Sequence, residues 1–278
     1  MKAYLTGGVD GVARRLETVG PGIERRKLIH DFLWDAGFLE GGLGAREFGE
    51  IFRLIDSLPF PEDKAQALDA DVLRLVRAQP TQVALDTMRH LESNSLQTAF
   101  ALGAGERLAM EEGRQVGPLA RQLEEEHATE LICQWADKLG KYRKVAPEGL
   151  AAELAAAALD DKQRVMAIDA FVNSLTSVSG SELVATATRV PGEAKLIEKL
   201  LIKGYGNWLR EDSKTAGADL RQKSAAVPDA AYDEIVTRQA FQLSNAGDMP
   251  SARQWAGTVR NDERRAATLM LLEAQEPR

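Results

Sequence analysis

Residues 227–259 read VPDAAYDEIVTRQAFQLSNAGDMPSARQWAGTV, and this stretch contains the pattern on which the fold prediction depends. Its first half has the spacing of a long amphipathic helix. A polar turn with Asn245, Gly247, Asp248 and Pro250 follows, and the remainder has the pattern of a short helix. The stretch therefore predicts two helices joined by a tight turn.

The same alternation of helices and breaks continues along the rest of the chain. Strand signals are weak, whereas apolar residues recur at helical spacing throughout. We therefore predict an all-α fold. The expected short helices are 10–19, 45–58, 81–91, 116–126, 147–159, 180–190, 214–227 and 250–259, and the expected long ones are 23–36, 61–78, 94–112, 127–140, 161–176, 192–210, 229–245 and 261–273.

The ends of the short helices recur at a nearly constant interval. The interval averages about 34 residues, which is the period of tetratricopeptide-type helix–turn–helix repeats. We predict a right-handed α-solenoid of about eight such repeats forming a single domain over residues 1–278. An irregular α-bundle would also contain evenly spaced helices. The ends that define the interval are Val19, Leu58, Leu91, Glu126, Leu159, Val190, Val227 and Val259, and all but Glu126 are Leu or Val.

This pattern resembles that of tetratricopeptide-like α-solenoid proteins from Asp10 to Leu272. The family signature of Trp, Leu-Gly and Tyr followed by Ala, Phe and Pro is not reproduced in any unit. Trp255 with its neighbouring alanines, and Pro228, match only part of it. The resemblance implies the fold and a binding groove, and it assigns no functional residue.

Composition restricts the possible functions. The net charge of −7 argues against a broad surface for nucleic acid, so we expect no nucleic-acid partner. A single cysteine, Cys133, excludes an intrachain disulfide, and no apolar run is long enough to span a membrane. We expect a soluble protein that is cytoplasmic as written, or exported if a leader has been removed.

No residue pattern indicates catalysis, a cofactor or a metal. The three histidines are far apart and form no HxxxH pair. The glycine run at 41–44 lacks a preceding strand and a following Lys-Ser/Thr, so we interpret it as an inter-repeat loop. We interpret the acidic run 124–126 as a solvated helix face. We therefore expect no cofactor and no metal, and the enzyme question stays open with a preference for a non-enzyme.

The segment Gly204-Tyr205-Gly206-Asn207-Trp208 places two glycines inside a predicted helix. Each glycine costs about 1 kcal/mol relative to alanine. One interpretation is close approach of a neighbouring helix beneath Tyr205 and Trp208. The other is a kink that opens a ligand pocket beside Trp208.

The predicted function is a non-catalytic scaffold that binds a protein or peptide on the concave face of the array. Alternatives are an α-helical enzyme with an inter-helix pocket near Trp208 and an RNA-binding helical repeat. Because first helices line the concave face of such solenoids, we expect the partner to contact their polar residues. The residues expected to contact it are Arg14, Glu50, Arg53, Asp86, Arg89, Gln122, Arg221, Arg253 and Gln254.

The sequence Leu269-Met270-Leu271-Leu272 is apolar on all sides of one helical turn. Either the following residues fold back over it, another chain covers it, or the sequence is part of a longer protein. We expect a homodimer formed through this C-terminal helix.

Overall fold

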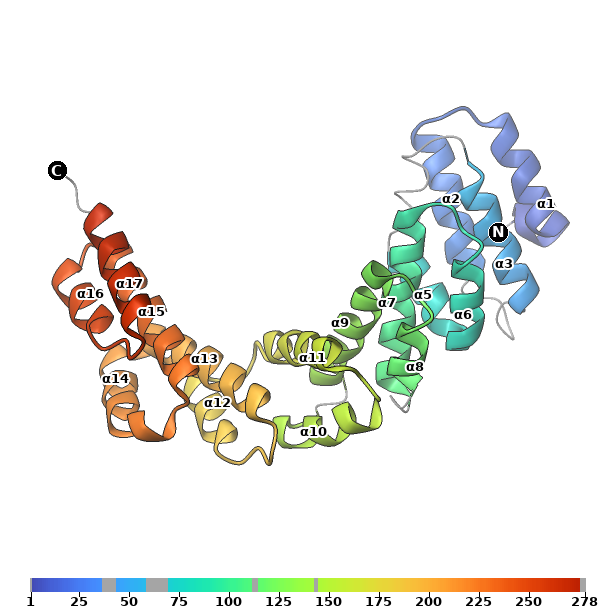
Figure 1. Cartoon of the computed structure of the whole chain (residues 1–278). Helices are drawn as coiled ribbons and strands as arrows, with labels where there is room; N and C mark the ends of the chain where they lie inside the picture. Colours follow the sequence, from blue (N-terminus) through green and yellow to red (C-terminus); the bar gives the residue numbers. More distant parts are fainter. Residues whose placement is uncertain (1, 37–43, 59–69, 112–114, 143–144, 276–278) are drawn as a thin grey trace. The chain divides into compact units, whose positions relative to one another are not determined.

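The computed structural model describes residues 2–36, 44–58, 70–111, 115–142 and 145–275. Within these ranges the chain forms sixteen α-helices, one 3₁₀ turn and no strand (Figure 1). The all-α prediction is confirmed, whereas the right-handed array of tetratricopeptide-like repeats stays a prediction. Residues 41–43 of the glycine run, and the expected start of a helix at Pro61, lie outside the described residues.

The chain divides into two compact units. Unit 1 comprises residues 1–143 and 153–167, and unit 2 comprises residues 144–152 and 168–278. Two helices, α10 (Pro147–Ala156) and α11 (Asp161–Ser174), contribute residues to both units. The expectation of one domain over residues 1–278 stays a prediction.

Unit 1 is built around α7, which contacts α5, α6 and α9. Two glycines allow its backbone to approach the neighbours closely. A Cβ on Gly103 would lie 2.7 Å from Val76 Cγ1 of α5, and a Cβ on Gly105 would lie 2.5 Å from the Leu131 carbonyl oxygen of α9. The described helices of unit 1 are α1 (Lys2–Thr18), α2 (Ile23–Ala36), α3 (Ala45–Asp56), α5 (Ala70–Ala78), α6 (Thr81–Met88), α7 (Asn94–Met110), α8 (Val116–Ala120) and α9 (Glu125–Lys141).

Unit 2 has the predicted alternation of short and long helices. The short helices α12, α14 and α16 lie in one layer, and the long helices α13, α15 and α17 lie in the other (Figure 1). Each long helix contacts the next one. The elements are α12 (Gly180–Ala187), α13 (Ala194–Glu211), α14 (Ser213–Gln222), the 3₁₀ turn η2 (Ser224–Ala226), α15 (Asp229–Asn245), α16 (Met249–Ala256) and α17 (Asp262–Ala274).

The stretch 227–259 folds as its sequence predicts. Helices α15 and α16 contact each other across a turn in which Gly247 has a φ of +83°, a conformation that suits glycine. Asp248 caps α16 by accepting a hydrogen bond from the Ser251 N–H at 3.1 Å. Trp255 is half-buried and packs against a core of Ala240, Ala252, Ala256 and Leu272.

An apolar residue recurs at the end of the short helices. In five short helices this residue lies three positions after the helix ends. The residues are Leu91 after α6, Leu123 after α8, Leu159 after α10, Val190 after α12 and Val259 after α16. All five are buried or half-buried. The N–H groups of Leu91, Leu123 and Val259 donate to the carbonyl three residues earlier, at 3.1, 3.1 and 3.2 Å. Helices α6, α8 and α16 therefore share a 3₁₀ ending that turns an apolar side chain inward.

Two expected boundaries are corrected. Helix α8 ends at Ala120, not at Glu126, because Glu124 has an extended conformation and Glu125 begins α9. The acidic residues of this run thus lie at the N-terminus of α9, where the helix dipole favours them, and Leu123 replaces Glu126 as the recurring apolar residue. Helix α1 begins at Lys2, but Gly8 interrupts it with a φ of +57°, so its regular part begins close to the expected Asp10.

Candidate partner-binding groove

Three sequence-predicted residues of unit 1 meet in one polar network. Arg89, the residue that follows α6, donates to Asp86 Oδ1 at 2.8 Å and to Gln122 Oε1, beyond α8, at 2.6 Å. All three side chains are exposed. The structure therefore brings Asp86, Arg89 and Gln122 together, as the prediction of a shared face requires.

A shallow pocket of about 330 Å³ lies beside this network between α3 and α6. Arg53 and Asp86 line it, together with Arg46 and His90. Glu50 does not line it, and its carboxylate accepts a hydrogen bond from Arg46 Nε at 2.8 Å. The pocket is small, and its charged side chains are already engaged with close neighbours in sequence.

The other predicted residues lie elsewhere. Arg14 is exposed on α1 of unit 1. Arg221 on α14, and Arg253 and Gln254 on α16, are exposed in the short-helix layer of unit 2. The nine residues therefore form one small network and several separate positions, and their role in binding stays a prediction.

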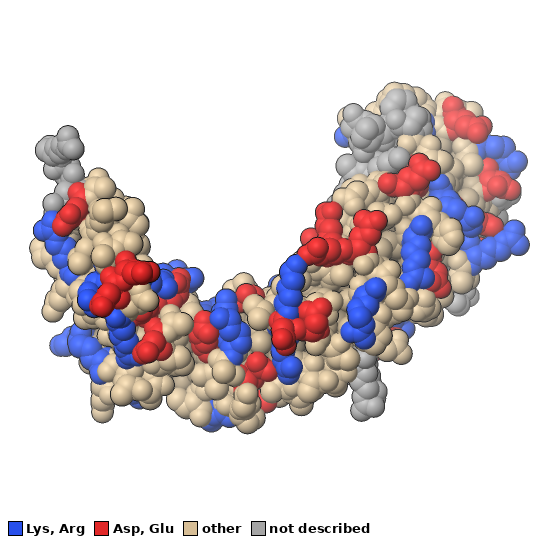
Figure 2. Space-filling view, viewed as in Figure 1, with Lys and Arg blue, Asp and Glu red and all other residues tan. Residues whose placement is uncertain are grey.

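A larger groove, of about 850 Å³, lies in unit 2 and was not predicted. It lies over the long-helix layer, whereas the prediction placed the partner on the short helices. Figure 2 shows acidic and basic side chains intermixed over this part of unit 2. Its lining comprises Asp169, Val172 and Asn173 of α11, Glu198, Lys199, Ile202, Lys203, Gly206, Asn207 and Arg210 of α13, Ala230, Glu234, Arg238 and Gln242 of α15, and Arg264 of α17.

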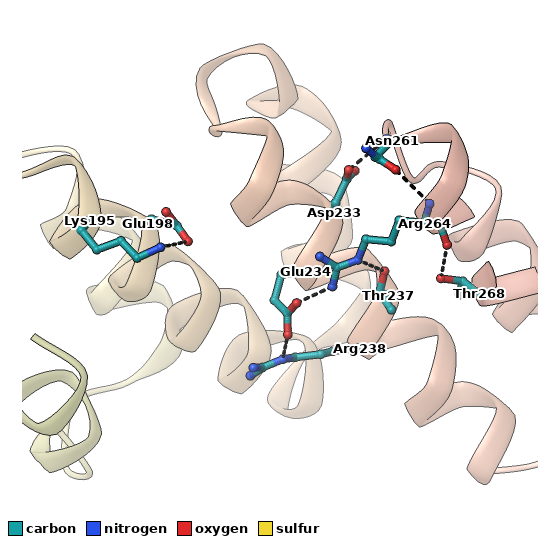
Figure 3. Close-up of polar contacts among 9 residues, drawn as sticks. All are labelled: Lys195, Glu198, Asp233, Glu234, Thr237, Arg238, Asn261, Arg264 and Thr268. Atoms are coloured by element: carbon teal, nitrogen blue, oxygen red, sulfur yellow. Dashed lines mark hydrogen bonds and ion pairs between the residues drawn. The ribbon is translucent and has the colours of Figure 1, made fainter. Parts of the chain in front are cut away.

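Every carboxylate that lines the groove has a basic partner. Asp169 pairs with Lys199 at 2.7 Å, and Glu198 pairs with Lys195 at 2.8 Å. Glu234 accepts hydrogen bonds from Arg238, at 2.6 Å, and from Arg264 of α17 (Figure 3). These pairs link α11 to α13 and α15 to α17, so they order the groove as well as neutralise its acidic groups.

The ion pairs around Glu234 determine its protonation. Burial by itself would raise the pKa of its carboxyl group. The hydrogen bonds and charges of Arg264 and Arg238 outweigh that effect and hold the pKa below the ordinary value of 4.5. Glu234 is therefore an ionised structural link at neutral pH.

Two basic residues of the groove have a different environment. The Lys203 ammonium group donates to the carbonyl oxygens of Val172 at 2.7 Å and Asn173 at 3.0 Å, near the end of α11. Burial lowers the pKa of Lys203 from its ordinary value of 10.5. Arg210 donates to the Gly206 carbonyl at 3.1 Å and to the Asn207 side chain at 2.6 Å. Neither residue forms an ion pair with a carboxylate within the described part of the chain.

The two glycines of α13 face opposite sides of the helix. A Cβ on Gly204 would lie 2.9 Å from Val184 Cγ2 and 3.0 Å from the Gly180 carbonyl oxygen, both of α12. A Cβ on Gly206 would meet no atom within 4 Å, and this glycine lines the groove. Gly204 therefore has the expected role in close helix approach.

Helix α13 runs without interruption from Ala194 to Glu211, so it has no kink beside Trp208, which the second of the two interpretations required. Trp208 does not line the groove, and its ring stacks on Tyr205 with 6.1 Å between centroids. Tyr205 is fully buried and donates to Asp219 at 2.7 Å. Burial and this hydrogen bond raise the pKa of Tyr205, so it serves as a packed structural residue.

Sequence reasoning missed the groove although a signal was present. Lys199, Lys203 and Arg210 recur at intervals of four and seven residues on one face of α13. Glu234, Arg238 and Gln242 recur every four residues on α15. These are polar stripes, but the sequence does not show that the two stripes lie along one groove.

Across the part of the chain that the structure describes, no helix is both long enough and apolar enough to cross a membrane. In the same residues, no group of three or more His, Cys, Asp or Glu side chains is arranged to hold a metal ion. His127 is buried and hydrogen-bonds with the Asn94 side chain at 3.0 Å, which gives it a structural role.

Comparison of the chain with protein-family models, with curated proteins and with solved structures gives no match.

Proposed function

We propose that this chain is a non-catalytic binding protein that holds an extended segment of a partner protein in the groove of unit 2. The main support is the lining of this groove, which presents charged and amide side chains from four helices. Such groups form ion pairs and hydrogen bonds with a peptide backbone and its polar side chains. The neutralised carboxylates order the groove before a partner arrives, which reduces the entropic cost of binding.

The size of the groove suits a short segment. The lining residues of α13 extend from Glu198 to Arg210, and twelve residues of helix rise about 18 Å. An extended chain covers that length with about five or six residues. A segment of this length would contact α13 and α15 together.

The alternatives have less support. An enzyme pocket beside Trp208 lacks the kink that would open it. An RNA chain carries one negative charge per nucleotide, whereas only Lys203 and Arg210 among the basic residues of the lining lack a carboxylate partner in the described chain. The face of the short helices that carries the predicted contact residues is the other candidate binding surface. One experiment distinguishes binding on that face from binding in the groove.

The test is a selection of random displayed peptides on the full chain, followed by affinity measurement for enriched sequences by fluorescence anisotropy. Gly206→Leu places a side chain in the groove, where no neighbouring atom obstructs its Cβ. We expect this variant to weaken binding at least about tenfold, because the peptide loses the space it occupies.

The matched control is Ala218→Leu, which adds the same bulk to an exposed position of α14 in the short-helix layer. Its affinity should equal that of the unmodified chain. The double variant Arg221→Glu/Arg253→Glu tests the sequence-predicted face. Normal binding by Gly206→Leu with loss of binding by the double variant would contradict the groove and favour the short helices. A selection that enriches no peptide would contradict the proposed function itself.

We also propose that α17 forms a contact between two copies of the chain. Leu272 is buried in the unit 2 core, and Leu269 packs against that core. Since residues one and two positions away point elsewhere on a helix, Met270 and Leu271 face outward and are 68% and 53% exposed. Adjacent exposed apolar side chains of this size favour association.

A further inference from the structure

We infer that the groove of unit 2 selects an acidic segment, in which two carboxylates about three residues apart pair with Lys203 and Arg210. This inference rests on the proposed function and adds the chemistry of the ligand.

The lining of the groove contains more basic than acidic residues. Five basic residues line it against three acidic ones, an excess of two positive charges in a chain whose net charge is −7. The acidic residues are all paired, as are Lys199, Arg238 and Arg264. Lys203 and Arg210 are the two basic residues of the lining that have no carboxylate partner among the described residues, and their charge opposes the sign of the molecule as a whole.

Lys203 is suited to receive a carboxylate. Its ammonium group is half-buried and bonds to two carbonyl oxygens, which supply partial charges but no full negative charge. An ammonium group has three donors, so one remains for a ligand. A partly buried cation binds a carboxylate more strongly than an exposed one does, because water screens the interaction less.

Arg210 provides the second position. Its hydrogen bonds use Nε and Nη2 and stay within its own helix, so the guanidinium group retains donors for a ligand. Lys203 and Arg210 are seven residues apart on α13, which is two helical turns or about 10.5 Å. Three residues of an extended peptide cover about 10 Å, and this match sets the spacing of the two acidic groups.

The paired carboxylates favour a peptide over RNA. A peptide carries acidic groups at chosen positions and places neutral residues opposite Asp169, Glu198 and Glu234. An RNA strand carries a phosphate at every nucleotide, but only Lys203 and Arg210 among the basic residues of the lining lack a carboxylate partner in the described chain. The mixed lining therefore selects for the pattern of charge as well as for its sign.

The experiment uses fluorescein-labelled synthetic peptides of Gly, Ser and Ala that contain two Glu residues three positions apart. One reference peptide replaces both Glu with Gln, and another places them next to each other. Affinities for the full chain are measured by anisotropy. We expect the spaced Glu peptide to bind at least about tenfold more tightly than the Gln peptide, the ratio expected of a charge-assisted hydrogen bond.

The protein variants assign this preference to residues. Arg210→Gln should remove most of the Glu-over-Gln preference, whereas Lys214→Gln, which removes one positive charge from an exposed position of α14, should leave it intact. Lys203→Met is the second variant, and its urea midpoint is measured because Lys203 also bonds to the end of α11.

The outcomes separate the two proposals. Equal affinity for Glu and Gln peptides, with Gly206→Leu blocking both, would overturn the acidic preference and leave the proposed function standing. Unchanged preference in Arg210→Gln and in a folded Lys203→Met variant would also overturn it. Binding of every peptide by Gly206→Leu would overturn both proposals. If a single-stranded oligouridylate displaces the peptide and binds more tightly, the ligand of the groove is RNA and not an acidic peptide.

Discussion

Single residues of α13 show how the same residue type has opposite roles two positions apart. Gly204 is required because α12 lies too close for any side chain, whereas Gly206 faces open space. In the interior of a helix, glycine costs about 1 kcal/mol relative to alanine. At Gly204 this cost is offset by close packing against α12. At Gly206 no packing offsets it, and the missing side chain leaves space in the groove.

This contrast predicts stability changes of opposite sign. Gly206→Ala should raise the free energy of unfolding by about 1 kcal/mol through helix propensity. Gly204→Ala should lower it by about 1–3 kcal/mol, because the new Cβ would collide with Val184 and the backbone of Gly180. Urea unfolding followed by circular dichroism measures both, and each variant is the control for the other. Destabilisation by both would show that Gly206 also has a packing role.

Other residue roles were predictable where they depend on local sequence. Ser179 and Asp248 cap α12 and α16, and such caps can be read from the sequence because an N-cap acts only three residues along the chain. The role of Gly206 was not predictable, because it depends on which neighbour lies opposite its face of α13. A stripe pattern identifies the inward side of a helix but not the distance to the next helix.

Among the elements, long-range carboxylate caps hold two of the long helices in place. Asp56 of α3 accepts hydrogen bonds from the N–H groups of Glu92 and Ser93, at 2.5 and 3.1 Å, just before α7. Asp233 of α15 accepts from Arg260 and Asn261 at 2.6 and 3.0 Å, just before α17 (Figure 3). In both cases the donors are the two residues that follow a recurring apolar residue, Leu91 or Val259. The caps thus fix where a long helix begins relative to an earlier helix.

The cap of α17 can be tested by substitution. Asp233 is only 4% exposed, so Asp233→Ala would leave two backbone N–H groups without their acceptor. We expect the free energy of unfolding to fall by about 1–3 kcal/mol, the usual cost of losing hydrogen bonds to a buried charged group. Asp233→Asn retains one acceptor oxygen and should lose less. Hydrogen exchange should become faster first in α17, and equal exchange in all three proteins would show that the cap contributes nothing.

Helix existence followed from the sequence, and most of the helices that the structure describes begin and end within a few residues of their predicted bounds. The clearest error was α8, where the expected helix runs six residues too far. Glutamates 124–126 favour a helix by propensity, but the chain turns at Arg121 and begins a new helix at Glu125. The caps by Asp56 and Asp233 were also missed, since their partners lie 27 to 37 residues away.

For the whole molecule, the net charge of the chain differs in sign from the local charge of the groove in unit 2. The net charge of −7 predicts weak attraction to polyanions at a distance, but it conceals the local excess of positive charge in unit 2. The sequence-predicted contact residues were chosen by analogy with the first helices of a solenoid. The groove of unit 2 lies on the long helices instead, because polar stripes of α13 and α15 border the same space. Only the relative placement of helices reveals such a site.

The exposed face of α17 leads to a prediction about association. Burying a large apolar side chain stabilises a complex by roughly 1.5–3 kcal/mol, and Met270 and Leu271 are already partly covered. The dimer should therefore be weak, with a Kd on the order of 0.1–1 mM. Light scattering at increasing concentration should show a mass rising above 30.4 kDa. Met270→Glu/Leu271→Glu should remain at the monomer mass, because charges on both copies would then face each other.

The matched control is Ala266→Glu/Ala267→Glu, which places the same charges on exposed positions of α17 one turn earlier. If association depends on Met270 and Leu271, this variant should still gain mass with concentration. Loss of association in both double variants would indicate that added negative charge alone keeps the copies apart. A mass of 30.4 kDa for the unmodified chain at every concentration would contradict the dimer, and it would leave peptide binding in the groove untouched, because none of the residues that line the groove belongs to this apolar face.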